Sequence, residues 1–487
     1  MLFNSLDFAI FLPLVFLLYW FVFSKSRKSQ NCFILFSSYL FYGWWDWRFL
    51  LLIFFSSIVD FLVGYKIHSI NHKVKRKILL LISISLNIGL LCYFKYFNFF
   101  IESFNDAFLV FGQDFQITRI DIILPVGISF YTFQTLSYTI DIYREKLKPT
   151  TKIIEFLGFV SFFPQLVAGP IERAKDLLPQ FGKKRFFNLS NGIDGMRQIL
   201  YGLFKKIVIA DSCAIYVNDI FANHEIYSGI ILFLGGVLFA FQIYCDFSGY
   251  SDIAIGVSNL LGIQLSQNFA FPYFSRNIAE FWRRWHISLS TWFRDYLYIP
   301  LGGSRGSLLK NIRNVFIIFV ISGLWHGANY TFIAWGVLHS LFFIPLLVLN
   351  KNRNHIEILA KNKIFPDFKE LISVLITFNF VVLGWILFRS EDILVAKTFY
   401  INIFSDIFSV NSYREALTFI YYQIGYPFII IIICFITLEY LGRRFQYGFG
   451  IIQSISNPVI RKLIYTLIMA IILSYSHQES PFIYFQF

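Results

Sequence analysis

The sequence predicts an all-α polytopic membrane protein. Hydrophobic residues make up 57% of the chain and charged residues only 15%, and 62 of the 487 residues are phenylalanine. Because a soluble domain carries about 25% charged residues, this chain has too few to cover its surface with charge. The basic residues cluster in short loops between apolar runs. That pattern is typical of cytoplasmic loops and, despite the net charge of +13, argues against a nucleic-acid partner.

The loop charges predict on which side of the membrane each connection lies. Basic and non-basic connections alternate between the apolar runs near 6–23, 31–43, 49–65, 78–97 and 122–141. Such alternation is expected when consecutive helices cross the bilayer, and here it places the N-terminus outside. The later runs near 371–388, 422–441 and 463–476 place the C-terminus outside as well. We expect one domain over residues 1–487 with about 11–13 transmembrane and re-entrant helices.

The middle of the chain carries too many charges for a helix that faces lipid. The charged or ionisable residues of segment 272–303 are Arg276, Glu280, Arg283, Arg284, His286, Arg294 and Asp295. Polar or non-helical backbone at membrane depth persists only where protein or water surrounds it. We therefore expect half-membrane and in-plane helices here, which form the walls of a central cavity. The five cysteines are scattered without metal-ligand spacing, so no metal site is expected. A permanently bound cofactor is not expected either.

Two Trp-His dipeptides stand out in this apolar chain, Trp285-His286 and Trp325-His326. An ionisable side chain within a membrane segment is costly and is a functional candidate for that reason. Histidine, with an unperturbed pKa of about 6.5, exchanges protons near neutrality. Gly327, which follows His326, is small enough to leave room for a substrate beside the ring. The alternative is a structural histidine that is hydrogen-bonded between helices.

Two carboxylates lie in the apolar stretch 244–252. Asp246 and Asp252 either orient a catalytic imidazole, pair with the arginines at 283 and 284, or form a purely structural ion pair between helices. A third histidine, His339, lies thirteen residues beyond His326 and could face the same cavity.

Three arginines are candidates for binding an anionic donor. Arg283 and Arg284 offer planar, permanently charged groups suited to phosphate. Arg305 lies in the glycine-rich loop 300–306, which could cover the donor. The alternative is an ordinary cytoplasmic turn whose charges set the topology.

Four segments together resemble the membrane-bound O-acyltransferase (MBOAT) superfamily, and within it the AlgI-like and PatA-like alginate and peptidoglycan O-acetyltransferases. They read FFPQLVAGPIER, YCDFSGYSDIAIG, FWRRWHISLSTWFRDYLYIPLGGSRG and GLWHGANYTFIAWGVLHS. The resemblance implies a ring of helices around a central funnel, with His326 as the essential histidine and His286 as the second. It also implies residence in the bacterial cytoplasmic membrane. Acetyl would pass from cytoplasmic acetyl-CoA to a separate extracytoplasmic transferase of the SGNH type, with peptidoglycan favoured as acceptor over alginate.

The last residues, 480–487, form an aromatic segment that its composition alone would make an interfacial anchor. They resemble a C-terminal motif of the same branch in which a tyrosine is implicated as a transient acyl carrier. The resemblance assigns that role to Tyr484, on the outer face. A phenol, with a pKa of about 10, is a better leaving group than a sugar hydroxyl, so onward transfer is favourable.

Two other functions remain open from the sequence. The first is transfer of D-alanine from a carrier protein to teichoic acid, which uses the same kind of chemistry. The second is a transporter that uses the histidines as a proton relay, although the inverted repeats typical of that class are not evident in the sequence.

Overall fold

A computed structural model describes residues 1–113, 117–476 and 482–483, and within these residues all regular secondary structure is helical. The helices are α1 (Leu6–Leu17), α2 (Arg27–Gly43), α3 (Arg48–Ser69), α4 (Lys73–Leu91), α5 (Phe97–Val110), α6 (Ile128–Tyr143), α7 (Ile153–Ser161), α8 (Phe163–Leu166), α9 (Ala174–Phe181), α10 (Leu189–Leu203), α11 (Asp211–Ala222), α12 (Gly229–Leu260), α13 (Ile278–Arg284), α14 (Ile287–Phe293), α15 (Leu308–His326), α16 (Tyr330–Val348), α17 (Phe368–Arg389), α18 (Ile393–Asp406), α19 (Val410–Phe419), α20 (Tyr426–Gly442) and α21 (Pro458–Tyr475). Short π-helical or 3₁₀-helical segments are η1 (Leu18–Val22), η2 (Cys92–Tyr96), η3 (Phe204–Ala210), η4 (Pro272–Phe274), η5 (Arg294–Tyr298), η6 (Ile420–Ile424) and η7 (Gly448–Ser454).

Several helices are long and apolar enough to cross a bilayer, which confirms the predicted all-α polytopic class. Among the described residues there are 7, at Arg48–Ser69, Lys73–Val110, Gly229–Leu260, Leu308–His326, Tyr330–Val348, Phe368–Arg389 and Pro458–Tyr475. An eighth span results if α18 and the following helix, which meet at 116°, count as one broken span. The expected 11–13 also included shorter helices, such as the apolar Leu6–Val22 and Tyr426–Gly442.

The described residues form two compact units. Unit 1 comprises Met1–Met196 and Ala254–Ser266, and unit 2 comprises Arg197–Ile253 and Gln267–Phe487. The sequence alone did not predict this division, because α10 and α12 each continue without a break from one unit into the other.

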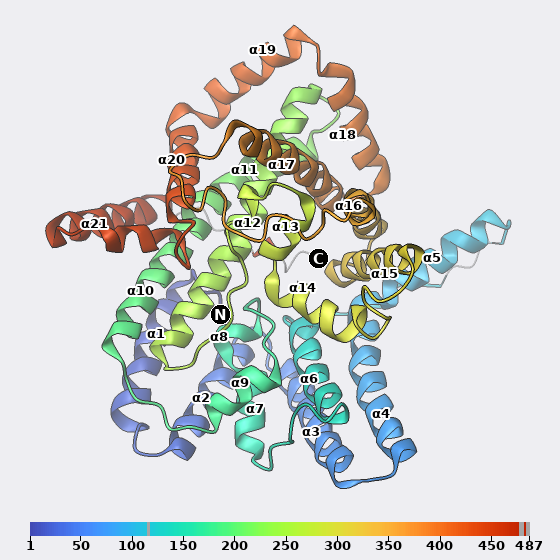
Figure 1. The fold of residues 1–487 in the computed structure, drawn as a ribbon, viewed down its shortest axis with the longest axis vertical. Coiled ribbons are helices and arrows are strands. Elements are labelled where there is room, and N and C mark those ends of the chain that lie inside the picture. Colours follow the sequence, from blue (N-terminus) through green and yellow to red (C-terminus); the bar gives the residue numbers. More distant parts are fainter. Residues whose placement is uncertain (114–116, 477–481, 484–487) are drawn as a thin grey trace. The chain divides into compact units, whose positions relative to one another are not determined.

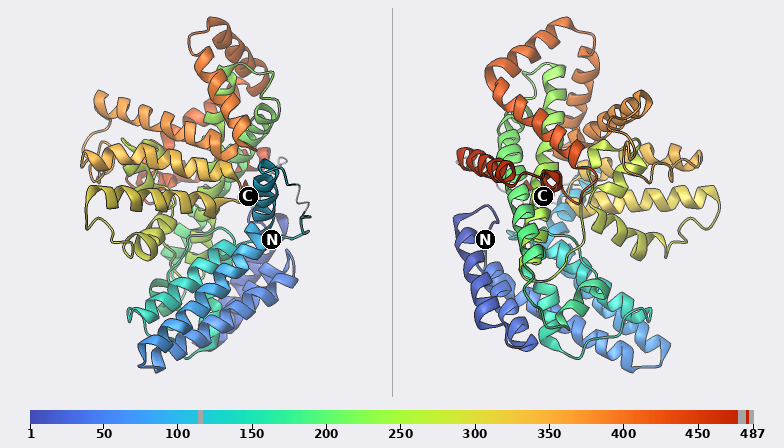
Figure 2. Two further views of the ribbon diagram at one scale, coloured as in Figure 1. Left: turned by 90° about the vertical axis from the view of Figure 1, so that its right-hand side faces the viewer. Right: turned by 60° about the vertical axis from the view of Figure 1, so that its left-hand side comes forward.

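Unit 1 is built from helices that lie side by side, as both views of Figure 2 show for α3, α4 and α6. A polar seam joins these three helices. The carboxylate of Asp60 on α3 accepts hydrogen bonds from Ser83 Oγ at 2.5 Å and Asn87 Nδ2 at 2.8 Å, both on α4. Thr135 on α6 completes the seam by donating to Asn87 Oδ1 at 3.2 Å. Hydrogen bonding of this kind is what allows polar side chains to be buried in a membrane protein.

One predicted loop of unit 1 is helical. The non-basic connection expected between the apolar runs near 78–97 and 122–141 begins with α5, which continues from α4 through the π-helical segment η2 (Figure 1). The added residue per turn of a π-helix allows the ladder of backbone hydrogen bonds to continue past a local change in side-chain direction. The charges of this region therefore did not mark the end of the helix.

Unit 2 contains α15, α16 and α17, which lie side by side in Figures 1 and 2. Gly323 allows α15 to approach α16 closely, since a Cβ at this position would lie only 2.1 Å from the carbonyl oxygen of Phe332. Small residues at such crossings permit close helix packing without a penalty from side chains. Before α15, the helices α13 and α14 have only 7 residues each, as expected for the charged segment that cannot face lipid.

Candidate active site

The first Trp-His dipeptide forms a sharp break between two short helices. Trp285 is extended, with φ −99° and ψ 128°, and ends α13. His286 adopts the left-handed conformation, with φ 43° and ψ 55°, and begins α14. A residue other than glycine in this conformation is uncommon and is often found at functional sites. The surrounding contacts hold His286 in this strained position, where its side chain is only 1% exposed.

Asn268 determines which nitrogen of His286 carries the proton. His286 Nδ1 lies 3.0 Å from Asn268 Oδ1, and the same oxygen accepts bonds from the backbone N–H of Ser288 at 3.3 Å and from Ser288 Oγ at 2.9 Å. Because a backbone N–H can only donate, the shared atom must be the amide oxygen. His286 Nδ1 therefore donates its proton to Asn268, and in the neutral form of the ring Nε2 carries a lone pair.

The second Trp-His dipeptide ends α15. His326 is its last residue, and Asn329 begins α16 three residues later by accepting the backbone N–H of Thr331 at 2.9 Å. The ring of His326 is 3% exposed and packs edge-on against Trp335 at 5.2 Å and Phe388 at 5.2 Å. Packing against aromatic rings thus fixes the orientation of this imidazole.

The space beside Gly327 is closed, contrary to what its small size suggested. A Cβ at Gly327 would lie 2.0 Å from the ring of Phe332, so that ring already occupies the position next to the glycine. Phe332 in turn packs on Phe388 at 4.8 Å, within the same aromatic group that surrounds His326. A substrate must therefore reach His326 from another direction.

Two tryptophans connect three histidines into one row of rings. Trp325 lies between His286, at 5.8 Å, and His326, at 5.0 Å, measured between ring centroids. Trp335 lies between His326, at 5.2 Å, and His339, at 4.8 Å. The structure therefore brings together both predicted catalytic histidines, and it places the third candidate, His339, in the same aromatic cluster.

A cavity of about 650 Å³ opens next to this row of rings. It is lined by Trp282, Leu289, Ser290, Phe293, Arg294, Tyr298, Ser304, Asn311, Val315, Ile318, Phe319, Ser322, Phe343, Leu347, Asn350, Asn352 and Arg353. Ser290 lies one helical turn after His286 on α14, and Ser322 lies one turn before His326 on α15. The cavity therefore has walls that lead toward both dipeptides. Its volume is typical of a site for a small-molecule ligand.

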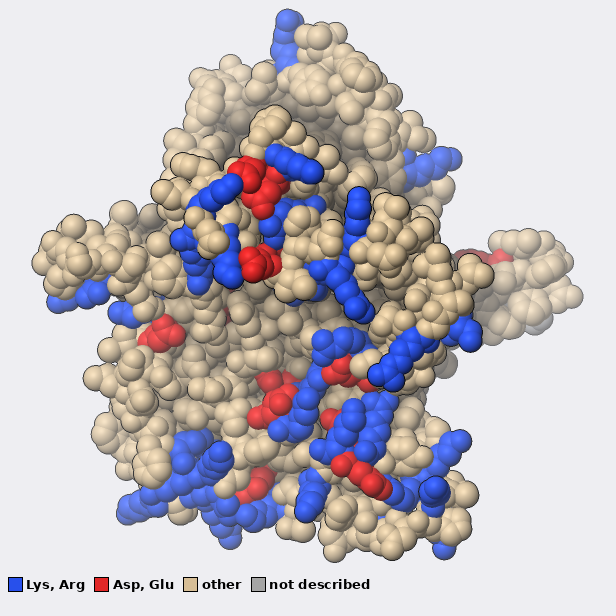
Figure 3. All heavy atoms as spheres, in the orientation of Figure 1, with Lys and Arg blue, Asp and Glu red and all other residues tan. Residues whose placement is uncertain are grey.

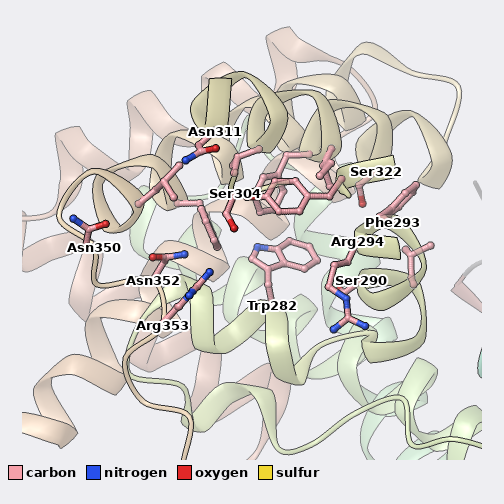
Figure 4. Close-up of a pocket in the computed structure, with 17 residues that line it drawn as sticks. Trp282, Ser290, Phe293, Arg294, Ser304, Asn311, Ser322, Asn350, Asn352 and Arg353 are labelled. Carbon is pink, nitrogen blue, oxygen red and sulfur yellow. The ribbon is translucent and has the colours of Figure 1, made fainter. Parts of the chain in front are cut away.

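Two arginines lie at the sides of this cavity. Figure 4 shows Arg353 and Arg294 on opposite sides of the Trp282 indole, with Ser304 nearby. Arg294 forms an exposed ion pair with Asp295 at 2.7 Å. A mainly apolar pocket with a few charged groups at its sides suits a ligand that has an anionic end and a neutral arm.

The predicted donor-binding arginines lie outside the lining of the cavity. Arg283 donates to the carbonyls of Asn352 at 2.8 Å and Asn354 at 2.7 Å, and thus holds the loop that carries Arg353. Arg284 pairs with Glu280 at 2.8 Å. Basic and acidic side chains lie together over this region of α13 in Figure 3. The direct roles expected for Arg283 and Arg284 therefore remain predictions.

The third predicted arginine, Arg305, is exposed in the loop beyond Ser304. Its backbone N–H closes a turn onto the carbonyl of Gly302 at 3.1 Å. Its side chain does not line the cavity, although that of the preceding residue does.

The two aspartates of α12 pair with lysines. Lys206 Nζ lies 2.8 Å from Asp246 Oδ1, and Lys205 Nζ lies 2.5 Å from Asp252 Oδ2. Lys206 also pairs with Asp211 at 2.7 Å. Of the alternatives left open by the sequence, the structure supports ion pairs, but with lysines of η3 and not with the arginines at 283 and 284.

Sequence reasoning missed several residues of the site. The pair Lys205-Lys206 was visible as two cations inside the apolar run FKKIVIA, a pattern that is costly unless acids lie nearby. Asn268 carried no such signal, because nothing local distinguishes an asparagine that accepts from a histidine 18 residues away. Tyr484, the predicted carrier, lies outside the described residues.

The helical membrane fold and the row of buried histidines define a class of membrane protein with an ionisable site, and comparison with known proteins identifies the family. The model of the MBOAT family, membrane-bound O-acyltransferases, matches residues 144–378. A probable alginate O-acetylase AlgI of Pseudomonas putida is 37% identical, over 100% of each chain. The chain therefore belongs to the membrane-bound O-acyltransferase family and is a multi-pass membrane O-acyltransferase.

Two further relatives show how the similarity is distributed. A peptidoglycan O-acetyltransferase of Helicobacter pylori is 36% identical over 81% of this chain and 78% of its own length. A teichoic acid D-alanyltransferase of Bacillus subtilis is 30% identical over 55% of this chain and 69% of its own length. The similarity to O-acetyltransferases thus extends over more of the chain than the similarity to the D-alanyltransferase does.

Proposed function

We propose that this protein is a membrane O-acetyltransferase that takes acetyl from cytoplasmic acetyl-CoA and relays it across the membrane for O-acetylation of an extracytoplasmic polysaccharide. The observation that carries the proposal is the cavity of about 650 Å³ whose walls lie one helical turn from both His286 and His326. In this proposal the narrow arm of the donor occupies the cavity, and its thioester lies at the end of the cavity that leads toward the two imidazoles.

The charged groups around the cavity support an anionic donor. Arg294 and Arg353 lie on either side of Trp282 and suit the phosphates of coenzyme A, since guanidinium groups bind phosphate oxygens in pairs. Arg283 acts through its hold on the loop of Arg353. Arg284 and Arg305 would contribute charge near the entrance.

The chemistry is an acyl transfer from sulfur to oxygen. The hydroxyl oxygen of Tyr484 attacks the thioester carbonyl, a C–O bond forms, and the C–S bond breaks. His326 takes the phenolic proton and returns it to the departing thiolate, so the products are acetyl-Tyr484 and free coenzyme A. An extracytoplasmic transferase, which we expect to be of the SGNH type, then moves the acetyl group to the polysaccharide.

His286 has a supporting role in this mechanism. A second imidazole next to the thioester can either position it or stabilise the oxyanion. A ring whose Nε2 carries a lone pair accepts a hydrogen bond and does not donate one to an oxyanion. Positioning therefore agrees better with the bond to Asn268.

The extent of similarity supports acetyl over D-alanyl as the transferred group. The relatives that transfer acetyl match from 81% to 100% of this chain, whereas the D-alanyltransferase of Bacillus subtilis matches 55%. The alginate and peptidoglycan relatives are almost equally similar, at 37% and 36% identity. The acceptor is therefore proposed as a polysaccharide, with both of these within the class.

Vesicles that contain the full-length protein provide the test. We expect the protein to acquire radiolabel from acetyl-CoA labelled in its acetyl group, with release of one coenzyme A for each label, and to acquire none in His326→Ala. An excess of a carrier protein loaded with D-alanine should not reduce the labelling. If the protein acquired an acyl group from the loaded carrier but none from acetyl-CoA, D-alanyl transfer would replace the proposal.

A further inference from the structure

The described part of the C-terminal segment is buried within unit 2. Phe482 and Ile483 are only 1% and 2% exposed. The backbone N–H of Ile483 donates a hydrogen bond to Asp246 Oδ2 at 2.7 Å. A terminal segment that served only as an interfacial anchor would expose its aromatic side chains to the membrane surface. Phe482 and Ile483 are instead held in the protein interior, the latter by its backbone N–H.

One face of α12 provides the contacts for this segment. The ring of Phe482 packs against Tyr250 at 4.9 Å and against Phe247 at 6.3 Å. Asp246 and Tyr250 lie four residues apart, and Phe247 and Tyr250 three apart, so all three side chains project from the same side of the helix. This face therefore offers a carboxylate that accepts the backbone N–H of Ile483, and two aromatic rings that pack against Phe482.

The acceptor is prepared by an ion pair with a neighbouring lysine. Lys206 Nζ lies 2.8 Å from Asp246 Oδ1, which leaves the other carboxylate oxygen, Oδ2, directed at Ile483. Lys206 is itself held by Asp211 at 2.7 Å. A charged acceptor makes a stronger bond to a backbone N–H than a neutral one does.

The same face of α12 reaches the histidine site. Phe247, which contacts Phe482, also packs edge-on against His286 at 4.7 Å. Phe247 thus lies between the C-terminal segment and the first Trp-His dipeptide. The next residue of the chain after Ile483 is Tyr484, which lies outside the described residues.

We propose that Asp246, Phe247 and Tyr250 form a binding site for the chain's own C-terminal segment, and that Asp246 is a positioning residue that holds this segment by the backbone N–H of Ile483. The consequence for transfer rests on the function proposed above, since the site holds the residue directly before Tyr484 and Phe247 of the same site contacts His286. A fixed approach of the nucleophile raises the rate of an acyl transfer by removing orientational freedom.

A disulfide between the segment and α12 tests the location without reference to activity. In the full-length protein, the pair Tyr250→Cys and Phe482→Cys should form a disulfide under mild oxidation, identified by mass spectrometry of the linked peptides. The matched control is Phe482→Cys alone. There the native Cys245, the residue before Asp246 on α12, is the nearby thiol, and we expect no bond to it. Absence of the 250–482 bond, or preferential bonding to Cys245, would overturn the proposal.

A pair of variants at residue 483 tests the hydrogen bond while α12 remains unchanged. Ile483→Pro removes the N–H donor, and Ile483→Ala removes the side chain but retains the donor. For Ile483→Pro we expect acetylation by acetyl-CoA to slow about tenfold or more in kcat, with KM for acetyl-CoA unchanged because the cavity is intact. Ile483→Ala should keep most of the rate. Equal losses in both variants would contradict the role of the N–H bond.

The two experiments also separate this proposal from the function. If the disulfide forms but neither the native protein nor any variant acquires an acetyl group, the binding site is supported and the acetyl relay fails. If the native protein is acetylated and the disulfide does not form, the relay is supported and the binding site is overturned.

Discussion

The two Trp-His dipeptides have the same residues but are fixed in different ways. His286 lies in a break between two short helices, in a left-handed conformation, and a hydrogen bond to Asn268 holds its ring. His326 ends a helix of 19 residues, and edge-on contacts with Trp335 and Phe388 hold its ring. Trp325 packs against both imidazoles.

The difference teaches that a repeated dipeptide need not have a repeated role. A hydrogen bond fixes both the orientation of a ring and the position of its proton, and this gives His286 a defined acceptor nitrogen. Packing against aromatic rings, as at His326, fixes the orientation of a ring and does not by itself decide which nitrogen carries the proton. The first arrangement suits positioning, and the second suits proton transfer.

The largest expected effect separates the two histidines. His326→Ala should lower acetylation about 100- to 10,000-fold, which is the usual contribution of a general base. His286→Ala should cost less, about 10- to 100-fold, because it removes a positioning contact. The initial rate of label transfer from acetyl-CoA is the measurement. Equal losses in the two variants would remove the distinction between the dipeptides.

Variants of Asn268 sharpen the comparison. Asn268→Ala removes the acceptor for His286 Nδ1 and should lower kcat about 10- to 100-fold. Asn268→Asp keeps the acceptor, but its carboxylate favours the protonated ring, so the acidic limb of the pH–rate profile should move to higher pH. A profile unchanged by Asn268→Asp would mean that the protonation of His286 does not affect the rate.

The next largest effect is on donor binding in the cavity that leads toward both dipeptides. Arg353→Ala removes a cavity cation and should raise KM for acetyl-CoA about tenfold, the loss expected for one charge-assisted bond to phosphate. Arg305→Ala is the comparison variant and should raise KM less, because that side chain is exposed and does not line the cavity. Steady-state kinetics over a range of acetyl-CoA concentrations measures both. A larger rise in KM for Arg305→Ala would assign the phosphates to the glycine-rich loop.

The smallest expected effect concerns the aromatic ring that packs edge-on against His326. Trp335 Nε1 has no hydrogen-bond partner among the residues that the structure describes. Trp335→Phe therefore keeps an aromatic ring and loses no hydrogen bond, so the rate of acetylation should stay within about twofold of the native value. Trp335→Leu loses the edge-on contact with His326 and should be slower than Trp335→Phe. If Trp335→Phe were as slow as Trp335→Leu, the indole N–H would have a role in the reaction.

The sequence predicted much of the fold because the period and charge of its apolar runs are local properties. The run near 371–388 became α17 (Phe368–Arg389), and the charged segment 272–303 became the short helices α13 and α14. The helical continuation through η2 into α5 was not predicted, since charges alone do not mark the end of a helix. The division into two units depends on contacts between distant segments, which no local pattern reveals.

The site was predicted in part. The histidines were recognisable because ionisable groups are rare in apolar segments. The partner of His286 was not recognisable, because only the fold brings Asn268 next to it. The same holds for the lysines of η3, which only the fold brings next to the aspartates of α12. The direct involvement of Arg283 and Arg284 looked plausible from charge alone, but the structure shows both bonded to neighbouring protein groups.

The central claim is that His326 activates a nucleophile of this chain to receive acetyl. Mass spectrometry of the C-terminal peptide, after the full-length protein has been incubated with acetyl-CoA, tests it most directly. The account predicts the added mass of one acetyl group on Tyr484 in the native protein, and no added mass in His326→Ala or Tyr484→Phe. Unmodified Tyr484 in native protein that has bound acetyl-CoA, or an acetylated Tyr484 in His326→Ala, would contradict it.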